Sequence, residues 1–485
     1  MNKAVAYGVA TVAVLGGAYL GAVVYSGNVM QREYEAALDK VEKTLPFLKI
    51  VDRQYDKGLF SATATVSLQL GCSPLAGESG AKPPTLTFRD RITHGPLPGF
   101  TGVGLARIDT QLVLPPETPE KLRQWLDSMS IRTAVGFDGG MNTRVDLPAG
   151  EIKDAEGRLN WQPMHFVFSM NGAHTAINQD FAVPEITFNL ARDGETVSFK
   201  LANLRGESAS EFVGDVLRGE SANEFVGNML TDSGSGTGSL DLLQVASSRG
   251  NMQFDLNQVK FSVVQKVDNG LLGSTTALTG AANLKVGGRD FKFDKIELQE
   301  SMKRIHAPTL QKIVLGFWQE LGGLCNKTPE DFAASVEKQQ AALLFAMKDL
   351  LAYDPEYSVD KIAVTYEGHE GMLAYSVAAK GVTGEDLQQP DSRLMNKIIV
   401  KASSRVPLAW LQKIVEAGAM SQEQLDAMID KLVKTGNATR DGDVIASAAL
   451  FEGGQLTING KPFDIGPLLG LAPHQQDDAE DDSED

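Results

Sequence analysis

The alternation of apolar and polar residues predicts that strands dominate this chain. Apolar residues recur at every second position from Phe60 to Leu70 and from Thr85 to Thr93, which is typical of strands with one buried face. Asp193 and Gly194 are a hairpin-turn signal between two further strands. The other predicted strands are Gly104–Leu114, Ile131–Leu147, Trp161–Asn171, Ile186–Leu190, Thr196–Leu201, Asn251–Val264, Ser274–Val286, Asp290–Gln299, Ser358–Gly368, Met372–Ala379, Ala438–Leu450 and Gln455–Asn459.

Apolar residues spaced three and four apart predict several amphipathic helices. The first covers Val29–Leu48, where Pro46 ends or kinks it. The others are Thr118–Met129, His306–Leu321, Thr328–Leu351, Leu408–Gly418 and Ser421–Thr435, the last with a Ser421/Gln424 capping box. The predicted fold class is α+β: an N-terminal transmembrane helix followed by a large, mainly antiparallel β-rich body, with amphipathic helices in the C-terminal half.

The N-terminus carries a charge-free run, Ala4–Tyr25, that predicts a membrane anchor. A helix of this length spans roughly 33 Å, enough to cross a hydrocarbon core of about 30 Å. Lys3 precedes the run, whereas Arg32, Glu33 and Glu35 follow it with mixed sign. The positive-inside bias therefore places the N-terminus in the cytoplasm and the rest of the chain outside it.

Two further interpretations concern the same run. Gly16 and Ala18 would suit a signal-peptide cleavage site, but the apolar run continues well past Ala18. Gly17 and Gly21 form a small-xxx-small pair that would let two helices pack closely and dimerise. A Gly- and Ala-rich anchor without a partner would carry the same pair, so both readings stay open.

Charge and composition limit the class of partner. The 485 residues carry a formal net charge of −17, which argues against nucleic-acid binding because phosphate contacts need clustered Lys and Arg. Asp477–Asp485 is a strongly acidic run that cannot bury apolar surface. The predicted division is a membrane anchor (1–27), a stalk helix (28–48) that holds the acidic body off the membrane surface, a β-rich domain (49–305), an α+β C-terminal domain (306–472) and a disordered acidic tail (473–485).

A tandem repeat interrupts the strand pattern. Leu204–Val216 and Leu217–Met229 match at ten of thirteen positions. Ser208 and Glu211 of the first copy form a capping-box signature that recurs in the second, which predicts two short helices. Asp232–Ser239, rich in Gly and Ser, is predicted to be a flexible loop. Two copies are too few for a solenoid, so a local duplication in a surface segment is favoured over a functional repeat.

The sequence assigns no catalytic, cofactor-binding or metal-binding residue. The six histidines show no metal-ligand spacing, and no nucleophile elbow or phosphate-binding loop occurs. His94, in a sharp turn, is predicted to cap local backbone groups, with catalysis as the alternative. Cys72 and Cys325 would form a single disulfide in an oxidising compartment or stay as two buried thiols.

Several stretches resemble the YdgA-like family of bacterial envelope proteins of unknown function. Besides the N-terminal anchor, they are Tyr55–Ser61 (YDKGLFS), Ile92–Pro98 (ITHGPLP) and Gly453–Pro462 (GGQLTINGKP). The resemblance implies an inner-membrane anchor with a periplasmic body, and it brings no catalytic residues. The 13-residue duplication is not part of it.

Three functional hypotheses follow. The first is a non-enzymatic envelope protein whose long sheet offers an apolar concave face to a lipid or a protein segment. The second is a partner-binding scaffold that dimerises through Gly17 and Gly21. The third is a periplasmic hydrolase with a site assembled from distant residues, in which His94 would share a pocket with a carboxylate or a nucleophile.

Overall fold

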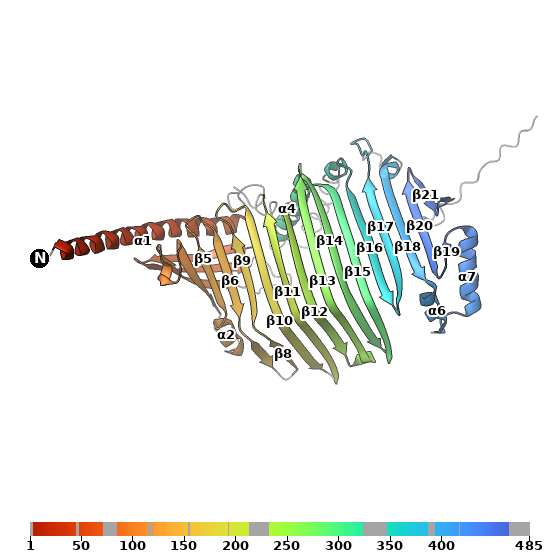
Figure 1. The fold of residues 1–485 in the computed structure, drawn as a ribbon, viewed down its shortest axis with the longest axis horizontal. Coiled ribbons are helices and arrows are strands. Elements are labelled where there is room, and N and C mark those ends of the chain that lie inside the picture. The colour runs from red at the N-terminus through yellow and green to blue at the C-terminus, as the bar shows by residue number, and fades with distance from the viewer. Residues whose placement is uncertain are drawn as a thin grey trace, which may run out of the picture.

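The computed structural model describes the chain except for residues 1–2, 45–47, 71–84, 115–117, 119, 154–155, 193, 213–231, 324–345, 347, 387–392, 417 and 465–485. The described residues form one long, 22-stranded antiparallel sheet with a few helices (Figure 1). The strands are β1 (Leu48–Lys57), β2 (Ser61–Leu70), β3 (Thr85–His94), β4 (Ala106–Val113), β5 (Ser130–Val135), β6 (Met141–Leu147), β7 (Gly150–Lys153), β8 (Gly157–Trp161), β9 (Met164–Met170), β10 (Ala176–Arg192), β11 (Glu195–Glu211), β12 (Ser233–Ser247), β13 (Met252–Asp268), β14 (Leu271–Val286), β15 (Arg289–His306), β16 (Glu356–Tyr366), β17 (His369–Ala379), β18 (Ile398–Pro407), β19 (Thr439–Asp441), β20 (Val444–Glu452), β21 (Gln455–Ile458) and β22 (Lys461–Phe463).

Most strands pair with their neighbours in the chain, so the sheet is largely a meander. β6 pairs directly with β9, and the long strand β10 pairs with β9 along its first half and with β8 along its second. Tight turns join many of the strands, for example Asn269 and Gly270 between β13 and β14, whose φ angles are 51° and 77°. Two consecutive positive φ angles are typical of a two-residue turn that suits the twist of a hairpin.

The helices are α1 (Lys3–Thr44), α2 (Glu120–Asp127), α4 (Ala307–Gly323), α6 (Leu408–Glu416) and α7 (Gln422–Thr435), with short 3-10 turns η1 (Pro98–Phe100), η2 (Arg249–Asn251) and η5 (Met395–Lys397). The predicted capping box of α7 is confirmed, since Ser421 accepts from the Gln424 amide and Gln424 accepts from the Ser421 amide. Leu425 and Ile429 of α7 are buried against β20 residue Ile445.

The N-terminal region is one continuous helix, not an anchor followed by a separate stalk helix. The side chains of α1 are described from Gly17 to Asp39. Among the described residues, no helix has both the length and the apolar character needed to cross a membrane, which leaves the span predicted at Ala4–Tyr25 without structural support. Val23, near the end of that span, is fully buried and lies against Gly95 of the body.

The sequence predicts two short helices in the tandem repeat (204–229) and a flexible loop after it (232–239). Both predictions are wrong where the structure describes these residues. Leu204–Glu211, most of the first repeat copy, belongs to β11 and pairs with both β10 and β12. Asp232–Ser239 is also not a loop, because β12 begins at Ser233. Hydrogen bonds to strands on both sides outweigh the local capping and loop signals. The second repeat copy lies outside the described residues.

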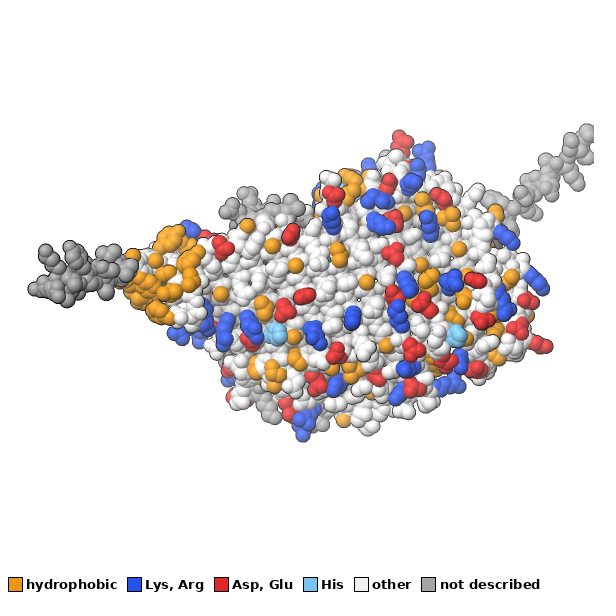
Figure 2. All heavy atoms as spheres, viewed as in Figure 1, with side chains coloured by type: hydrophobic (Ala, Val, Ile, Leu, Met, Phe, Trp, Pro, Cys, Tyr) orange, Lys and Arg blue, Asp and Glu red, His pale blue; other side chains and the backbone are white. Residues whose placement is uncertain are grey.

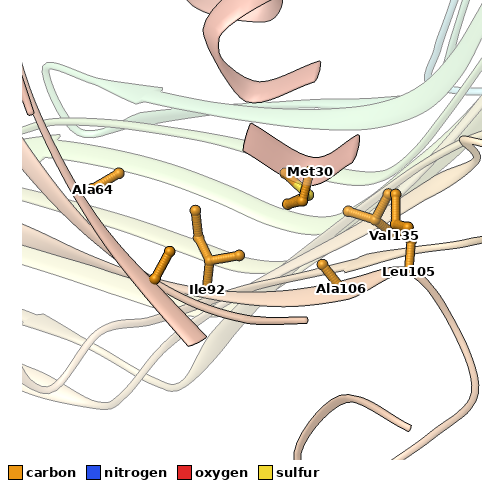
Figure 3. Close-up of a cluster of buried hydrophobic side chains, with 7 residues drawn as sticks. Met30, Ala64, Ile92, Leu105, Ala106 and Val135 are labelled. Atoms are coloured by element: carbon orange, nitrogen blue, oxygen red, sulfur yellow. The ribbon is translucent and has the colours of Figure 1, made fainter. Parts of the chain in front are cut away.

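The second half of α1 packs on the first strands of the sheet. Met30 lies in a cluster of buried apolar residues, most of them labelled in Figure 3: Ala62, Ala64, Ile92, Leu105, Ala106 and Val135. Beside this cluster, Tyr34 Oη and Thr110 Oγ1 each donate a 2.5 Å hydrogen bond to the buried Asp90 carboxylate. Burial, followed by the contact with Asp90, raises the pKa of Tyr34. The helix is therefore fixed by both apolar and polar contacts.

Replacing Gly27 of α1 should weaken this docking. An alanine Cβ would lie 2.6 Å from His94 Cε1, so the helix and the imidazole would have to separate. We expect the free energy of unfolding of the Gly27→Ala chain to fall by about 1–3 kcal/mol in urea titrations. Gly21→Ala is the matched control, because its Cβ meets nothing within 4 Å. Equal losses in the two variants would contradict the docking.

Candidate functional site

One face of the sheet carries continuous rows of large apolar side chains. Residues paired across antiparallel strands lie on the same face, so the pairing register defines each row. The first row crosses seven strands from β8 to β15 through Leu159, Phe188, Phe199, Val245, Phe254, Leu284 and Phe291. The second runs beside it from β8 to β16 through Trp161, Ile186, Leu201, Leu243, Leu256, Ala282, Phe293 and Tyr366.

A third row runs from β9 to β17 and crosses the other half of the long strands β10–β15. It consists of Phe166, Phe181, Gly206, Gly238, Phe261, Leu278, Leu298, Ile362 and Leu373. The two glycines belong to this row for a steric reason: a Cβ on Gly206 would lie 2.7 Å from the Phe181 ring and one on Gly238 would lie 2.1 Å from the Phe261 ring. Aromatic rings thus cover the glycine backbone.

Residues with positive φ angles inside the strands keep the three rows on one face of the sheet. Leu201 and Leu204 of β11 are three positions apart, and between them Asn203 has a φ of 53°. Gln258 of β13 has a φ of 49° in the same region of the sheet. A bulged or left-handed residue shifts the alternation of side chains by one position, so apolar residues continue on the same side beyond it.

The apolar rows are only partly covered. Every member of the first row is partly exposed, and the third row ends in Phe166 and Leu373, which are 40% and 42% exposed. Described helices pack on the ends of this face: α1 lies on β1–β5, α2 places Trp125 on Trp161, and α6 places Trp410 against Gly371. Among the described residues, the rows between these helices keep part of their apolar surface exposed, which is unusual for a folded chain.

The opposite face is charged and forms ion pairs. Lys295 and Lys361 both contact Glu297, at 2.8 and 2.9 Å, and Gln299 donates to its other oxygen at 2.8 Å. The lysine contacts lower the pKa of Glu297 to about 2. Figure 2 shows charged side chains of both signs spread over the face of the sheet that it presents.

A shallow depression of about 570 Å³ lies on this charged face. Small polar residues such as Thr237, Ser239 and Ser262 form its floor, and Arg205 and Lys260 are at its side. Its charges are mixed because Asp180 and Glu207 also line it. The depression therefore has no preference for a charge of one sign.

The structure places His94 beneath α1. The side chain is 3% exposed, and Nδ1 lies 3.3 Å from the carbonyl oxygen of Val23. A carbonyl only accepts, so Nδ1 carries the proton, and Nε2 is buried without a hydrogen-bond partner among the described residues. Burial lowers the pKa of His94. A neutral imidazole covered by a helix supports the predicted structural role and is out of reach of a substrate.

The other residues that the sequence singled out are dispersed. Gly17 and Gly21 are both exposed on α1 and have no neighbour within 4 Å at the Cβ position. Within the described part of the chain, no cluster of three or more His, Cys, Asp or Glu residues could hold a metal ion. Cys72 and Cys325 fall outside the described residues, and their pairing stays a prediction.

The comparisons with known proteins identify a family but no function. A family model described as a bacterial protein of unknown function (DUF945) matches residues 1–466. The chain belongs to this family. No curated protein and no solved structure matches it. Membership in DUF945 is consistent with the predicted uncharacterised bacterial family but does not confirm the narrower YdgA-like resemblance.

The apolar rows of this DUF945 protein were not assigned from the sequence as site residues. Their strands alternate visibly, but a row exists only when the register of many strands is known. A one-residue slip of any strand would move its apolar residues to the other face. In the sequence, only the recurrence of Phe and Leu at alternate positions of the strands points to such rows.

The buried His94 predicts a specific pH dependence of stability. Its folded pKa lies below the ordinary value of about 6.5, so below this pH the unfolded chain binds a proton that the folded chain does not. As the pH decreases below about 6.5, the free energy of unfolding should therefore fall by up to about 1.4 kcal/mol per pH unit, until the pH reaches the folded pKa. Urea titrations over a pH series would measure it.

His94→Asn keeps a donor for Val23 and should lack this component of the pH dependence. His369→Asn is the control, because His369 is exposed and its replacement should leave the profile unchanged. Identical profiles for the unmodified chain and His94→Asn would show that His94 is not the group responsible.

Proposed function

We propose that this chain is a non-enzymatic envelope protein that binds the hydrocarbon chain of a lipid along the apolar rows. The observation that carries the proposal is the first row, in which seven consecutive cross-strand positions are large, apolar and partly exposed. Seven strands at a spacing of about 4.8 Å make a row of roughly 29 Å. A lipid tail that spans half of a hydrocarbon core of about 30 Å fits within this length.

The driving force for such binding is the removal of apolar surface from water. Covering roughly 300 Å² of the rows with hydrocarbon would contribute about 7.5 kcal/mol, at about 25 cal/mol per Å². The described side chains of the rows carry no charge and only the Tyr366 hydroxyl and the Trp161 indole N–H as polar groups, so a tail would leave few polar groups unpaired. A hydrophobic protein segment is the second candidate occupant, and the experiment below separates the two.

The membrane attachment of the chain is part of the same proposal. The support is the charge-free run Ala4–Tyr25 together with α1, which extends from the body as one helix (Figure 1). We propose that this run is anchored in a bacterial inner membrane, with the N-terminus in the cytoplasm and the body in the periplasm, as in the YdgA-like family that it resembles.

Replacing a residue in the middle of the first row should remove a bound lipid. We expect Phe254→Glu to abolish lipid adducts in native mass spectra of the gently purified full chain, because a carboxylate on the row cannot meet hydrocarbon without a large desolvation cost. Val264→Glu is the matched control: it also replaces an exposed apolar residue of β13, but on the charged face. Adducts that are equal in both variants, peptide adducts, or no adducts in the unmodified chain would each overturn the lipid proposal.

The proposed anchor has its own test. Protease added to spheroplasts should degrade the body and spare an epitope tag at the N-terminus, and loss of the tag would contradict the proposed orientation. Gly17 and Gly21, both exposed on α1, are the proposed contact of a homodimer. In detergent, Gly17→Leu should then convert a dimer into a monomer, and an unchanged mass would exclude that contact.

A further inference from the structure

Exposed apolar side chains surround α1 where it leaves the body. They come from three segments: the helix itself, the β1–β2 turn and the loop between β3 and β4. We call this group the collar, and its members are Leu20, Val24, Tyr25, Leu59, Phe60, Leu97, Phe100 and Val103. Three of them are among the most exposed large apolar residues described, since Phe100, Val103 and Tyr25 are 81%, 79% and 70% exposed. Figure 2 shows a dense apolar patch at the left end of the body, where α1 lies in Figure 1.

Specific contacts hold the two loops beside the helix. The Tyr19 and Phe100 rings stack with centroids 6.5 Å apart, and Gly95 lies against Val23. Lys57 donates to Asn28 of α1, and the His94 amide donates to the Phe60 carbonyl at 3.1 Å. The loops therefore follow α1 along the same stretch in which its charge-free run ends.

The conformation of the loop presents Phe100 to the outside. Gly99 and Phe100 both have positive φ angles, 58° and 56°. Such a φ is unfavourable for a bulky aromatic residue, and exposure of its ring to water adds to the cost. A tip of this kind is stable in water only at an energetic cost, so an apolar environment that receives the ring would offset it.

We propose that the collar inserts into the interface of a lipid bilayer around α1. The proposal rests on the proposed membrane attachment of Ala4–Tyr25. Lipid that contacts the exposed side of the charge-free helix as far as Tyr25 must also meet the collar, since Leu20, Val24 and Tyr25 belong to both. The collar members are apolar, and two basic residues border them: Arg107 donates to Thr101 of the β3–β4 loop at 3.4 Å, and Lys57 precedes Leu59 in the chain. Both could contact anionic headgroups if the collar enters the interface.

Docking by the collar changes the predicted position of the body. A stalk helix of residues 28–48 would hold the body away from the membrane, but Met30 and Tyr34 of α1 pack on the sheet. With the collar in the interface, the β1–β4 end of the sheet is the part nearest to the lipid. The apolar rows begin a few strands beyond this end, so a lipid leaving the bilayer would have a short path to them.

Tryptophan quenching by brominated lipid tests the collar. The full chain is reconstituted in vesicles of phosphatidylethanolamine and phosphatidylglycerol, with or without bromine on the acyl chains. We expect the emission added by Phe100→Trp, and by Val103→Trp as a second collar variant, to shift to the blue and to be quenched by the brominated lipid. Val264→Trp, on the charged face of the sheet, should be quenched by neither lipid.

The outcomes separate the collar from the anchor. If the chain floats with the vesicles but the collar tryptophans are not quenched, the collar proposal is wrong and the attachment stands. A blue shift without quenching would mean that protein covers the collar, which also overturns it. If the chain does not float with the vesicles, the proposed attachment itself fails.

Discussion

The structure depends on a sheet that carries apolar rows on one face from β8 to β17. Backbone pairing of consecutive strands sets the register, and the register gathers Phe, Leu, Val and Ile side chains into rows that no single strand could form. Such a face must be covered to be stable in water. Described helices cover its ends, with Met30 of α1 on β1–β5 and Trp410 of α6 on β17, and leave the rows between them partly exposed. The charged face needs no cover, because its ion pairs and hydroxyl groups are solvated.

The same constraint explains the position of α1. Its apolar residues Val23 and Met30 are buried on the sheet, and the Asp90 carboxylate and the His94 imidazole complete the contact as hydrogen-bonded, buried polar groups. A helix that is tied to the sheet in this way cannot act as a free spacer. It places the collar and the charge-free N-terminus at the β1–β4 end of the sheet, whose apolar rows we propose to bind lipid.

Local signals predicted much of the fold. The hairpin at Gly194 and the Ser421 capping box could both be predicted because each depends on residues that are close in the sequence. The strands β11 and β12 were not predicted in full. Ser208 and Glu211 carry a helix-capping pattern and Gly234, Gly236 and Gly238 a loop composition, and only pairing on both sides makes them strands.

The sequence predicted that the sheet has an apolar face, but it did not predict which residues form that face. Alternating strands indicated an apolar face, whereas the members of each row depend on the positive φ angles of Asn203 and Gln258, which no local pattern reveals. The burial of His94 likewise required the long-range contact with Gly27 of α1. Both features come from tertiary packing, which a single sequence does not specify.

Photo-crosslinking in living cells tests the central claim most directly. A benzoylphenylalanine at Phe199, in the first row, would react with whatever covers that position, and mass spectrometry would identify the adduct. The account predicts adducts on lipid acyl chains, and none when the probe is placed at Val264 on the charged face. Adducts on a protein at Phe199, or equal lipid labelling at both positions, would contradict it.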